Sequence, residues 1–426
     1  MKIRSVALVG AAALALSGCG GGSGSSAGSS GADPNTPATI RLWLNGADTP
    51  QAMVDYATAE MTKLHPNVKV TFERQQWTGI VEKLTTALSS SDSPDVVELG
   101  NTQAQAFEAA GALTDLTSKK AGLGGDDLVQ SLVEAGSYDG KFYGVPYYGG
   151  ARIVVYRKDL FAKAGLKVPV STAQFVADGV KLTADNAATP NFSGIYFPGK
   201  YWYAALPFIW DNGGDIAVRD GSSWRGMLAS PGSVTGLKTV KSIMDTASKA
   251  PKDADESKDY KAFCANQVGM LMGPGWKVGQ ILDPKDGCPA LKGKIGAFAL
   301  PGRTAGTTAP AFLGGSNLAI SAKSKHQDLS YDLLKIMTSD GYQSKFAALG
   351  LLPAKKSLLS KVSGDEAAKA QALAAANSRF VPSSEKWAGV EASSVLPDML
   401  VAIARGGDIA TEAGKADTAI ASVLNG

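Results

Sequence analysis

The chain has 426 residues, of which 44% are hydrophobic and 19% charged, and its formal net charge is +3. This is an ordinary globular composition that excludes a wholly disordered chain, and the length suffices for two or three domains. The small charge argues against nucleic acid or an anionic membrane surface as a partner. Two histidines leave little room for a multi-histidine metal site, and three cysteines exclude a dense disulfide framework.

The first residues are typical of a bacterial export signal. Lys2 and Arg4 precede an apolar run, ending at Leu16, that is too short to remain as a membrane span. Leu-Ser-Gly-Cys19 then resembles a lipobox, in which cleavage before the cysteine is coupled to lipidation of its thiol. We predict a signal peptide at 1–18 and a lipidated Cys19, although an ordinary signal with an incidental cysteine would fit the same residues. Cleavage would leave 40 basic and 39 acidic side chains, a formal charge of +1.

Residues 19–37 are rich in Gly and Ser, which predicts a flexible linker between the lipid and a globular body. In the body, Cys264 and Cys288 remain. Because an exported protein meets an oxidising compartment, we expect them to form a disulfide, which closes a loop of about 25 residues and is worth roughly 3 kcal/mol. Two free buried thiols are the alternative.

Strand and helix patterns alternate from residue 39 onward. Strands alternating with helices predict a parallel sheet covered by helices on both faces. The predicted strands are 39–44, 68–72 and 95–99, and the predicted helices are 49–64, 79–88 and 102–110.

Polar and aromatic side chains follow each of these three strands. In parallel α/β sheets, ligands bind beyond the carboxyl ends of the strands. Taken singly, residues such as Asn and Asp are also common in turns, but the set favours a shared binding edge. Its members are Asn45, Asp48, Gln75, Gln76, Trp77, Glu98, Asn101 and Thr102.

Aromatic residues concentrate in two segments, 138–148 and 196–210, which hold 12 of the 32 aromatics in 26 residues. Phe208 is a candidate for the core, but the run from Tyr201 to Tyr203 cannot point inward as a whole. Exposed rings flanked by polar groups suit a ligand with apolar faces and a hydroxylated rim, such as a sugar. Stacking on nucleic-acid bases would require a basic groove, which the charge argues against.

Further patterns complete the chain. Residues 269–276 predict a buried strand ending in a turn that presents Trp276. Two more strands are predicted at 294–301 and 317–321, with the glycine-rich segment 312–317 between them. Its Gly314-Gly315 pair either brings main-chain N–H groups near a ligand or forms a plain turn. Helices are predicted at 329–337, 343–349, 366–377 and 395–404.

In this order, the segments resemble family 1 of the extracellular solute-binding proteins of bacterial ABC sugar importers, to which the maltose-binding protein belongs. The likeness runs through nearly the whole mature chain. It is carried by Ile40-Arg-Leu-Trp-Leu44, His65-Pro-Asn-Val-Lys-Val70, Ala87-Leu-Ser-Ser-Ser-Asp-Ser-Pro-Asp-Val96, Tyr138-Asp-Gly-Lys-Phe-Tyr-Gly-Val-Pro146, Val155-Tyr-Arg-Lys-Asp-Leu-Phe161, Asp211-Asn-Gly-Gly-Asp215, Met272-Gly-Pro-Gly-Trp276 and Phe312-Leu-Gly-Gly-Ser-Asn317.

The resemblance implies an α/β fold of the periplasmic-binding-protein-like type II, in which two α/β lobes joined by a hinge enclose a ligand cleft. Lobes of this kind close around their ligand. By similarity, the chain crosses between the lobes near 146–152, 299–302 and 351–354. The implied N-terminal lobe is 38–148 plus 301–351, and the implied C-terminal lobe is 149–300 plus 352–426.

The resemblance also implies which residues bind sugar. Polar contacts from the N-terminal lobe would come from Asn45, Asp48, Gln76, Trp77, Glu98 and Asn101. Second-lobe rings that stack on the sugar would be Trp202 or Tyr203, Trp276 and Trp387. Further contacts would come from Arg152, Gly314, Gly315 and Asn317. Many members have Gly-Pro-Trp where this chain has Gly-Pro-Gly-Trp276, and this insertion bears on where the indole points.

The implied function is capture of a di- or oligosaccharide for a membrane permease, with no cofactor, metal or catalytic residue. The permease and ATPase would be separate chains, because no membrane span follows the signal and no P-loop pattern occurs. We expect an extracytoplasmic monomer that is anchored to the membrane only by its lipid and binds no nucleic acid. The alternatives are a binding protein for a polyol, peptide or glycerol phosphate, and a secreted glycosidase whose two carboxylates would be Asp48 and Glu98.

Overall fold

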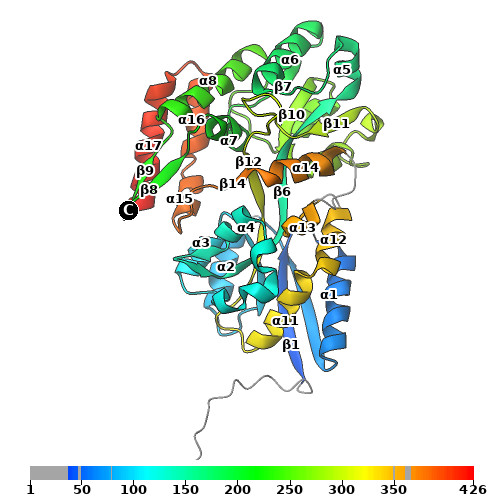
Figure 1. The fold of residues 1–426 in the computed structure, drawn as a ribbon, viewed down its shortest axis with the longest axis vertical. Helices are drawn as coiled ribbons and strands as arrows, with labels where there is room; N and C mark the ends of the chain where they lie inside the picture. Colours follow the sequence, from blue (N-terminus) through cyan, green and yellow to red (C-terminus); the bar gives the residue numbers. More distant parts are fainter. Residues whose placement is uncertain (1–36, 47–48, 78, 349–350, 360–365) are drawn as a thin grey trace, which may run out of the picture.

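The structure is a computed structural model that describes residues 37–46, 49–77, 79–348, 351–359 and 366–426. The predicted signal peptide, Cys19, most of the linker and Asp48 lie outside these residues. The described chain forms two lobes stacked along the long axis of the molecule (Figure 1).

The lower lobe in Figure 1 holds the N-terminal elements and part of the later chain. Its strands are β1 (Ala38–Asn45), β2 (Val68–Gln75), β3 (Val96–Gly100), β4 (Ser137–Tyr138), β5 (Lys141–Phe142) and β13 (Leu352–Pro353). Its helices are α1 (Gln51–Leu64), α2 (Ile80–Ser89), α3 (Ala104–Ala109), α4 (Gln130–Ala135), α11 (Gln327–Met337), α12 (Asp340–Ala348) and α13 (Lys356–Leu359), with 3₁₀ turns at Thr117–Leu123 and Gly125–Asp127.

The upper lobe holds the middle and the end of the chain (Figure 1). Its strands are β7 (Ser193–Tyr196), β8 (Ala217–Asp220), β9 (Ser223–Gly226), β10 (Val268–Pro274), β11 (Ile295–Phe298) and β14 (Ser378–Arg379). Its helices are α5 (Lys158–Ala164), α6 (Thr172–Asp185), α7 (Trp202–Asp211), α8 (Pro231–Thr246), α9 (Asp259–Cys264), α10 (Lys277–Ile281), α14 (Glu366–Ala376), α15 (Trp387–Ala392), α16 (Val395–Ala404) and α17 (Ile409–Asn425), with a 3₁₀ turn at Pro289–Leu291.

Side-chain alternation along β1 explains how helices cover both faces of the lower sheet. Leu42 points into a core shared with Met53 of α1, whereas Trp43 points into a core shared with Leu84 of α2. Successive strand residues face opposite sides, so one strand serves two helical layers. Strand β1 pairs with β2 and β3 in parallel, which confirms the predicted arrangement of the first three strands.

Two long strands, β6 (Gly144–Arg157) and β12 (Ala311–Ile320), join the lobes. They pair antiparallel to each other in a ten-stranded sheet whose main order is β2-β1-β3-β12-β6-β10-β7. The sheet is therefore mixed rather than wholly parallel. Residues 312–317 belong to β12, so this strand begins earlier than predicted and the plain-turn alternative for Gly314-Gly315 was wrong. Gly314 and Gly315 lie opposite Gly150 and Gly149, and this close strand approach accounts for the glycine pair.

Two predicted lobe boundaries differ from the contacts in the structure. Pro301 and Gly302 accept hydrogen bonds from Thr172 of α6 at 2.9 and 3.0 Å, so the segment predicted to enter the lower lobe at 301 still packs on the upper one. Conversely, Ala354 accepts a hydrogen bond from the N–H of Val129 at 2.9 Å, so the chain after 352 still lies on the lower lobe. Both crossings could be placed only through these long-range contacts.

The upper core is built around aromatic and aliphatic side chains of α6, α7, α8 and β10, and Phe208 is buried there as predicted. Residues Trp387–Ala404 are long and apolar enough for a membrane span by composition. They form two helices, α15 and α16, separated at Ser394, which has a φ of 58°. Leu396, Leu400 and Ile403 of α16 are buried in the lobe, so these helices contribute to its core.

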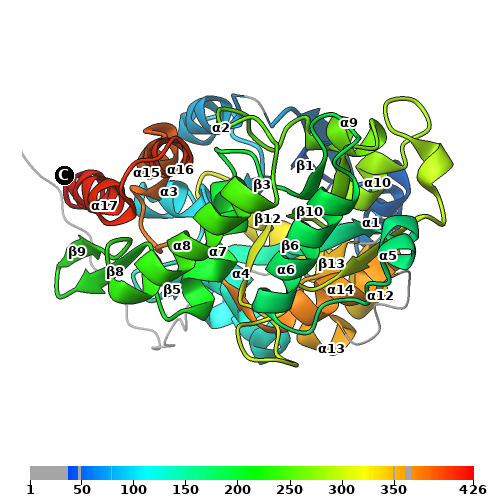
Figure 2. The ribbon, with the colours of Figure 1, turned by 90° about the horizontal axis from the view of Figure 1, so that it is seen from above.

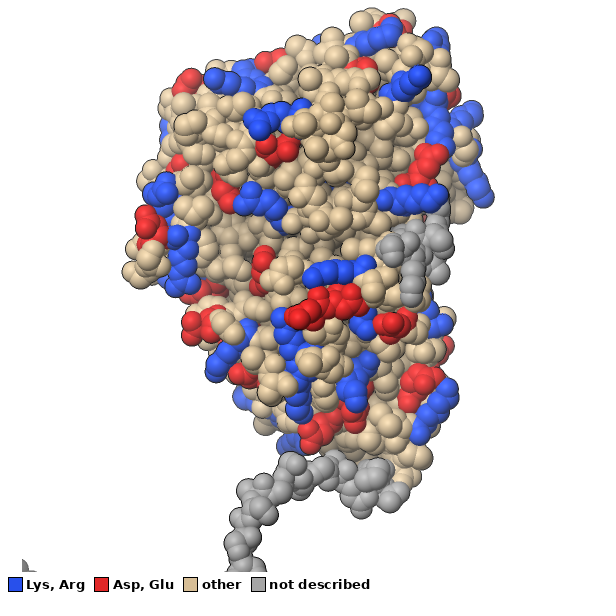
Figure 3. All heavy atoms as spheres, in the orientation of Figure 1, with Lys and Arg blue, Asp and Glu red and all other residues tan. Residues whose placement is uncertain are grey.

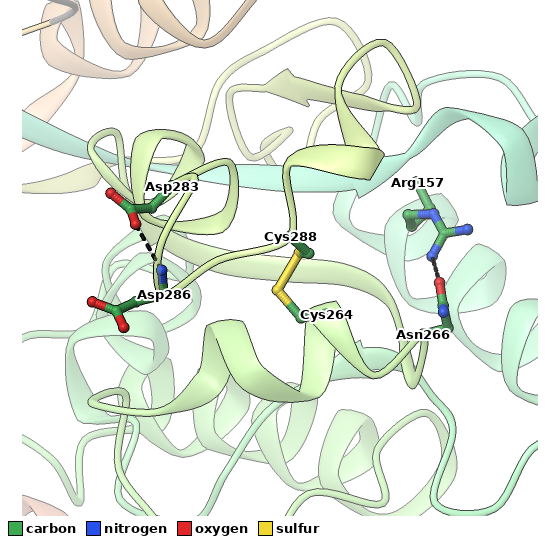
Figure 4. The surroundings of a disulfide bond; sticks show 6 residues. All are labelled: Arg157, Cys264, Asn266, Asp283, Asp286 and Cys288. Atoms are coloured by element: carbon green, nitrogen blue, oxygen red, sulfur yellow. Dashed lines mark hydrogen bonds between the residues drawn. A yellow bond between two sulfur atoms is a disulfide. The ribbon is translucent and has the colours of Figure 1, made fainter.

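The predicted disulfide is present (Figure 4). Cys264 ends α9 and Cys288 precedes the 3₁₀ turn at Pro289, with Cα atoms 5.4 Å apart. The loop that it closes contains β10, Trp276 and α10. The bond therefore holds together the two helices that flank the Trp276 turn.

Candidate functional site

The lower lobe offers exposed groups at the carboxyl end of its strands. Trp77 is 36% exposed, and its ring edge would lie 3.4 Å from a methyl group on Gly100 at the end of β3. Gln76 is also exposed. Asn101 is buried and donates from its side-chain Nδ2 to the carbonyl of Leu313 at 3.0 Å, so its amide ties β3 to β12.

Three other predicted contacts of this lobe have side chains in its interior. The Glu98 carboxylate accepts from the Asn45 N–H at 2.8 Å and from the Ser316 hydroxyl at 2.6 Å, and none of its surface is exposed. Asn45 is buried as well, and its Nδ2 donates to the carbonyl of Glu98 at 2.8 Å. Asn317 is fully buried and donates to the carbonyls of Leu132 and Gly144 at 3.1 and 3.0 Å. These side chains hold strand ends in register.

The upper lobe contributes stacked aromatic rings at the start of α7. Trp202 and Tyr203 are half-buried, and their ring centroids lie 3.6 Å apart. Tyr203 in turn stacks on Phe312 of β12 at 4.6 Å. Trp387 was predicted to face the cleft, but it is only 1% exposed and packs 6.3 Å from Trp202. Trp387 therefore packs behind the half-buried rings.

Glu391 of α15 joins these aromatics to the opposite lobe, and the sequence reasoning missed it. Its carboxylate accepts hydrogen bonds from the Tyr203 hydroxyl at 2.9 Å and the Trp387 Nε1 at 3.0 Å. A third bond comes from the Thr102 hydroxyl of the lower lobe, at 3.3 Å. Burial raises the pKa of Glu391, and the three donors oppose that shift. No local sequence pattern marks a single Glu in a helix as a site residue, so this contact becomes visible only in the fold.

Arg152 of β6 lies beneath the same rings. Its Nη2 bonds to the Glu256 carboxylate at 2.9 Å, and its guanidinium carbon lies 5.0 Å from the centroid of the Tyr203 ring. The side chain is only 6% exposed, and its Nε and Nη1 have no hydrogen-bond partner among the described residues. A buried donor without a partner is costly, but these two nitrogens are themselves buried, so a polar ligand group or water reaches them only if the rings that cover them shift.

The turn after β10 presents Trp276, as predicted, with 48% of the residue exposed. A methyl group on Gly150 would lie 2.9 Å from Cε3 of this indole, so the ring rests directly on the backbone of β6. A methyl group on Gly275 would overlap the side-chain amide of Gln371 in α14. The additional glycine before Trp276 is therefore required by the packing of α14 against the turn.

A buried ion pair supports the turn from below. Lys277 Nζ lies 2.7 Å from the Asp259 carboxylate, and both side chains are at most 5% exposed. The Tyr201 hydroxyl donates to the second Asp259 oxygen at 2.9 Å. Burial raises the pKa of Asp259, and Lys277 opposes that shift. The pair and the disulfide together fix α9 and α10 behind Trp276.

A surface cavity of about 390 Å³ adjoins the stacked rings. Trp202 and Tyr203 line it together with Glu256, Ser394 and Asp398. On the face drawn in Figure 3, acidic and basic side chains are interspersed rather than gathered by sign. Within the described ranges, no group of three or more His, Cys, Asp or Glu is arranged to hold a metal ion.

Comparison with known proteins identifies the family that matches this chain. Residues 45–344 match the family of bacterial extracellular solute-binding proteins. The chain is 36% identical, over 400 residues, to the diacetylchitobiose binding protein DasA of Streptomyces coelicolor, covering 92% of this chain and 91% of the relative.

Solved structures share the fold. The sugar-binding protein MalE of Xanthomonas citri aligns with a TM-score of 0.79 at 23% identity, over 91% of this chain and 97% of that one. The cyclic alpha-maltosyl-1,6-maltose binding protein of Arthrobacter globiformis aligns with a TM-score of 0.77 at 19% identity, over 92% of this chain and 100% of that one.

Proposed function

The chain belongs to the family of bacterial extracellular solute-binding proteins, and from this membership we propose that it is the lipid-anchored sugar-binding subunit of an ABC importer. Its place is extracytoplasmic, as for the family. Cys19 is the proposed anchor, and separate permease and ATPase chains are the proposed partners. The protein captures its ligand in the cleft, closes around it and delivers it without chemical change.

One observation carries the proposal. The exposed indoles of Trp77 and Trp276 and the stacked pair Trp202 and Tyr203 come from both lobes, and the guanidinium of Arg152 lies beneath the Tyr203 ring. Rings take the apolar faces of a sugar, and guanidinium nitrogens donate to its hydroxyls. A ligand that touches both lobes favours the closed state and shifts the population toward it.

The proposed set of ligand contacts is smaller than the set that the resemblance alone implied. We retain Gln76, Trp77, Arg152, Trp202, Tyr203 and Trp276 as ligand contacts, and Gly314 and Gly315 as half-exposed backbone of the hinge strand. Asn45, Glu98, Asn101 and Asn317 are proposed to act indirectly, because their amide and carboxylate groups hold the strand ends. Trp387 supports the rings.

A di- or oligosaccharide is the proposed ligand class. The relative that is 36% identical binds diacetylchitobiose by its name, which makes a β-linked disaccharide of N-acetylated sugars the first compound to test. The cleft aromatics suit more than one ring. A glycerol phosphate fits less well, because Nη2 of the one buried arginine beside the rings is already paired with Glu256.

The proposed lobes follow the contacts described above. We assign residues 38–148 and 317–359 to the N-terminal lobe and residues 149–310 and 366–426 to the C-terminal lobe. The first crossing lies in β6 and the second in β12.

The test is a thermal-shift screen of the mature protein against mono-, di- and oligosaccharides, followed by titration calorimetry. A ligand that binds the folded state alone raises the melting temperature. We expect a di- or oligosaccharide to do so, and a double Trp77→Ala and Trp276→Ala variant to lose the shift. A shift only with polyols or phosphate esters would refute the sugar assignment. Cleavage of any oligosaccharide during incubation would refute a purely binding role.

A further inference from the structure

A second cavity, of about 510 Å³, is lined by residues of both lobes. The β4–β5 hairpin of the lower lobe lines one side, and the β8–β9 hairpin of the upper lobe lines the other. Figure 2 shows β5 beside β8 and β9. Gln105 lines the cavity and donates to the Ser383 hydroxyl across the cleft at 2.6 Å. Thr102, three residues earlier, reaches Glu391 at the stacked rings. The residues that contact the two sites therefore both lie at the start of α3.

The cavity wall has the chemistry of a site for a neutral polar ligand. Tyr138 and Trp224 present one aromatic ring from each lobe. Around them, Arg219 and Lys386 balance Asp139 and Glu385, so the wall carries equal numbers of cationic and anionic groups. A charged ligand gains little from such a wall, and an apolar one would have to desolvate it. A hydroxylated ring with apolar faces satisfies both the aromatic and the polar groups.

Both hairpins hold their rings in place by backbone structure. The turn of the first has Asp139 and Gly140 at φ values of 48° and 73°, the left-handed pair that suits a tight two-residue hairpin. In the second, the Trp224 N–H donates to Asn425 Oδ1 at 2.7 Å, and Asn425 Nδ2 donates to the Trp224 carbonyl at 2.9 Å. The C-terminal helix α17 thus braces the hairpin, and little ordering of the hairpin backbones is left for a ligand to impose.

We infer that this cavity is an outer subsite, which holds the additional sugar units of oligosaccharides longer than the one or two rings at Trp202, Tyr203 and Trp276. The inference rests on the proposed function and adds chain-length selectivity to it. Because Tyr138 and Trp224 belong to different lobes, a sugar between them also bridges the cleft at its outer edge. The aromatic site then selects the sugar, and the outer subsite favours longer chains.

The test is titration calorimetry with maltooligosaccharides and chitooligosaccharides of two to five units. For the series that binds, wild-type affinity is expected to rise from the disaccharide to the longer members. Trp224→Ala and Tyr138→Ala should each remove about tenfold of that gain and leave disaccharide affinity nearly unchanged. Tyr331→Ala, on α11 at the far end of the lower lobe, is the matched control and should alter neither.

The outcomes separate the two proposals. If wild-type affinity does not depend on chain length, or if the two variants weaken short and long sugars equally, the outer subsite is refuted while sugar binding stands. If no member of either series binds and the wider sugar screen is also negative, the proposed function falls and the subsite with it. Thermal melts report whether each variant folds. If Trp224→Ala does not fold, the sugar affinities of Tyr138→Ala test the outer subsite.

Discussion

Glu108 of α3 should make the protein less stable as the pH rises through neutrality. Its side chain is buried, and neither carboxylate oxygen has a hydrogen-bond partner among the described residues. Burial raises the pKa of Glu108 from 4.5 to about 8. Between these values the folded protein keeps the proton and the unfolded chain loses it, so the free energy of unfolding falls as the pH rises.

The size of the effect follows from linkage. Each pH unit between the two pKa values costs about 1.4 kcal/mol, and titration near pH 4.5 reduces the loss slightly, so the loss from pH 5 to pH 7 is about 2.5 kcal/mol. Glu108→Gln removes this titration but keeps the side chain's shape. The stability difference, variant minus wild type, should therefore grow by about 2.5 kcal/mol over that interval.

The assay is urea denaturation of both proteins at pH 5, 6 and 7, with Glu82→Gln, at an exposed position of α2, as the control. The difference between two proteins cancels the titration of every other group. A difference that stays constant within about 0.5 kcal/mol across the series would show that Glu108 is ionised in the fold, or solvated. Because α3 also carries Gln105, which bonds to Ser383 across the cleft, ionisation of Glu108 in the folded protein should weaken sugar affinity above pH 8, where the loss of stability levels off.

Three other changes test the site. Replacing Cys264 and Cys288 by Ser should lower the free energy of unfolding by roughly 3 kcal/mol, because the disulfide closes a loop of 24-residue separation, and a loss below about 1 kcal/mol in denaturant titrations would contradict this. Trp276→Ala should weaken sugar binding by about 1–3 kcal/mol in calorimetry while the melting temperature without sugar hardly moves, since the residue is 48% exposed; a large drop in melting temperature would make it a core residue. Gly150→Ala should displace the indole that rests on it and weaken binding, whereas Gly279→Ala, whose methyl meets nothing within 4 Å, should not; equal affinities would refute the contact.

Local patterns predicted the elements that are defined by neighbours in sequence. The first three strands and helices lie within a few residues of the ranges expected from periodicity, and α16 spans Val395–Ala404 as expected. The plain-turn alternative for the Gly314-Gly315 pair was wrong, although two glycines usually mark a turn. Their extended conformation is set by the glycine pair on β6 that they face. That pair is too far away in the sequence for a pattern of neighbouring residues to reveal it.

The sequence indicated the class of ligand that the candidate site suits, but it indicated only some of the residues that form the site. Aromatic clustering indicated a sugar-like ligand, and Trp276 is exposed as expected. Burial of Trp387 depends on packing against Trp202, and the importance of Glu391 depends on donors from Thr102 and Tyr203. Such contacts join residues separated by 185 positions or more along the chain, so periodicity carries no information on them.

The strands β6 and β12 cross from lobe to lobe as a paired ladder with one register shift, between Ser316 and Asn317, and this pairing limits how the lobes can move. Sliding one strand along the other would break the ladder and turn every side chain to the opposite face. What remains is a change of twist, spread over several residues and easiest at the glycines Gly149, Gly150, Gly314 and Gly315, where no side chains interlock. The paired strands therefore have a preferred twist, which the sheet sets. Opening or closing the lobes changes this twist, and the free energy of that change is part of the free energy of ligand binding.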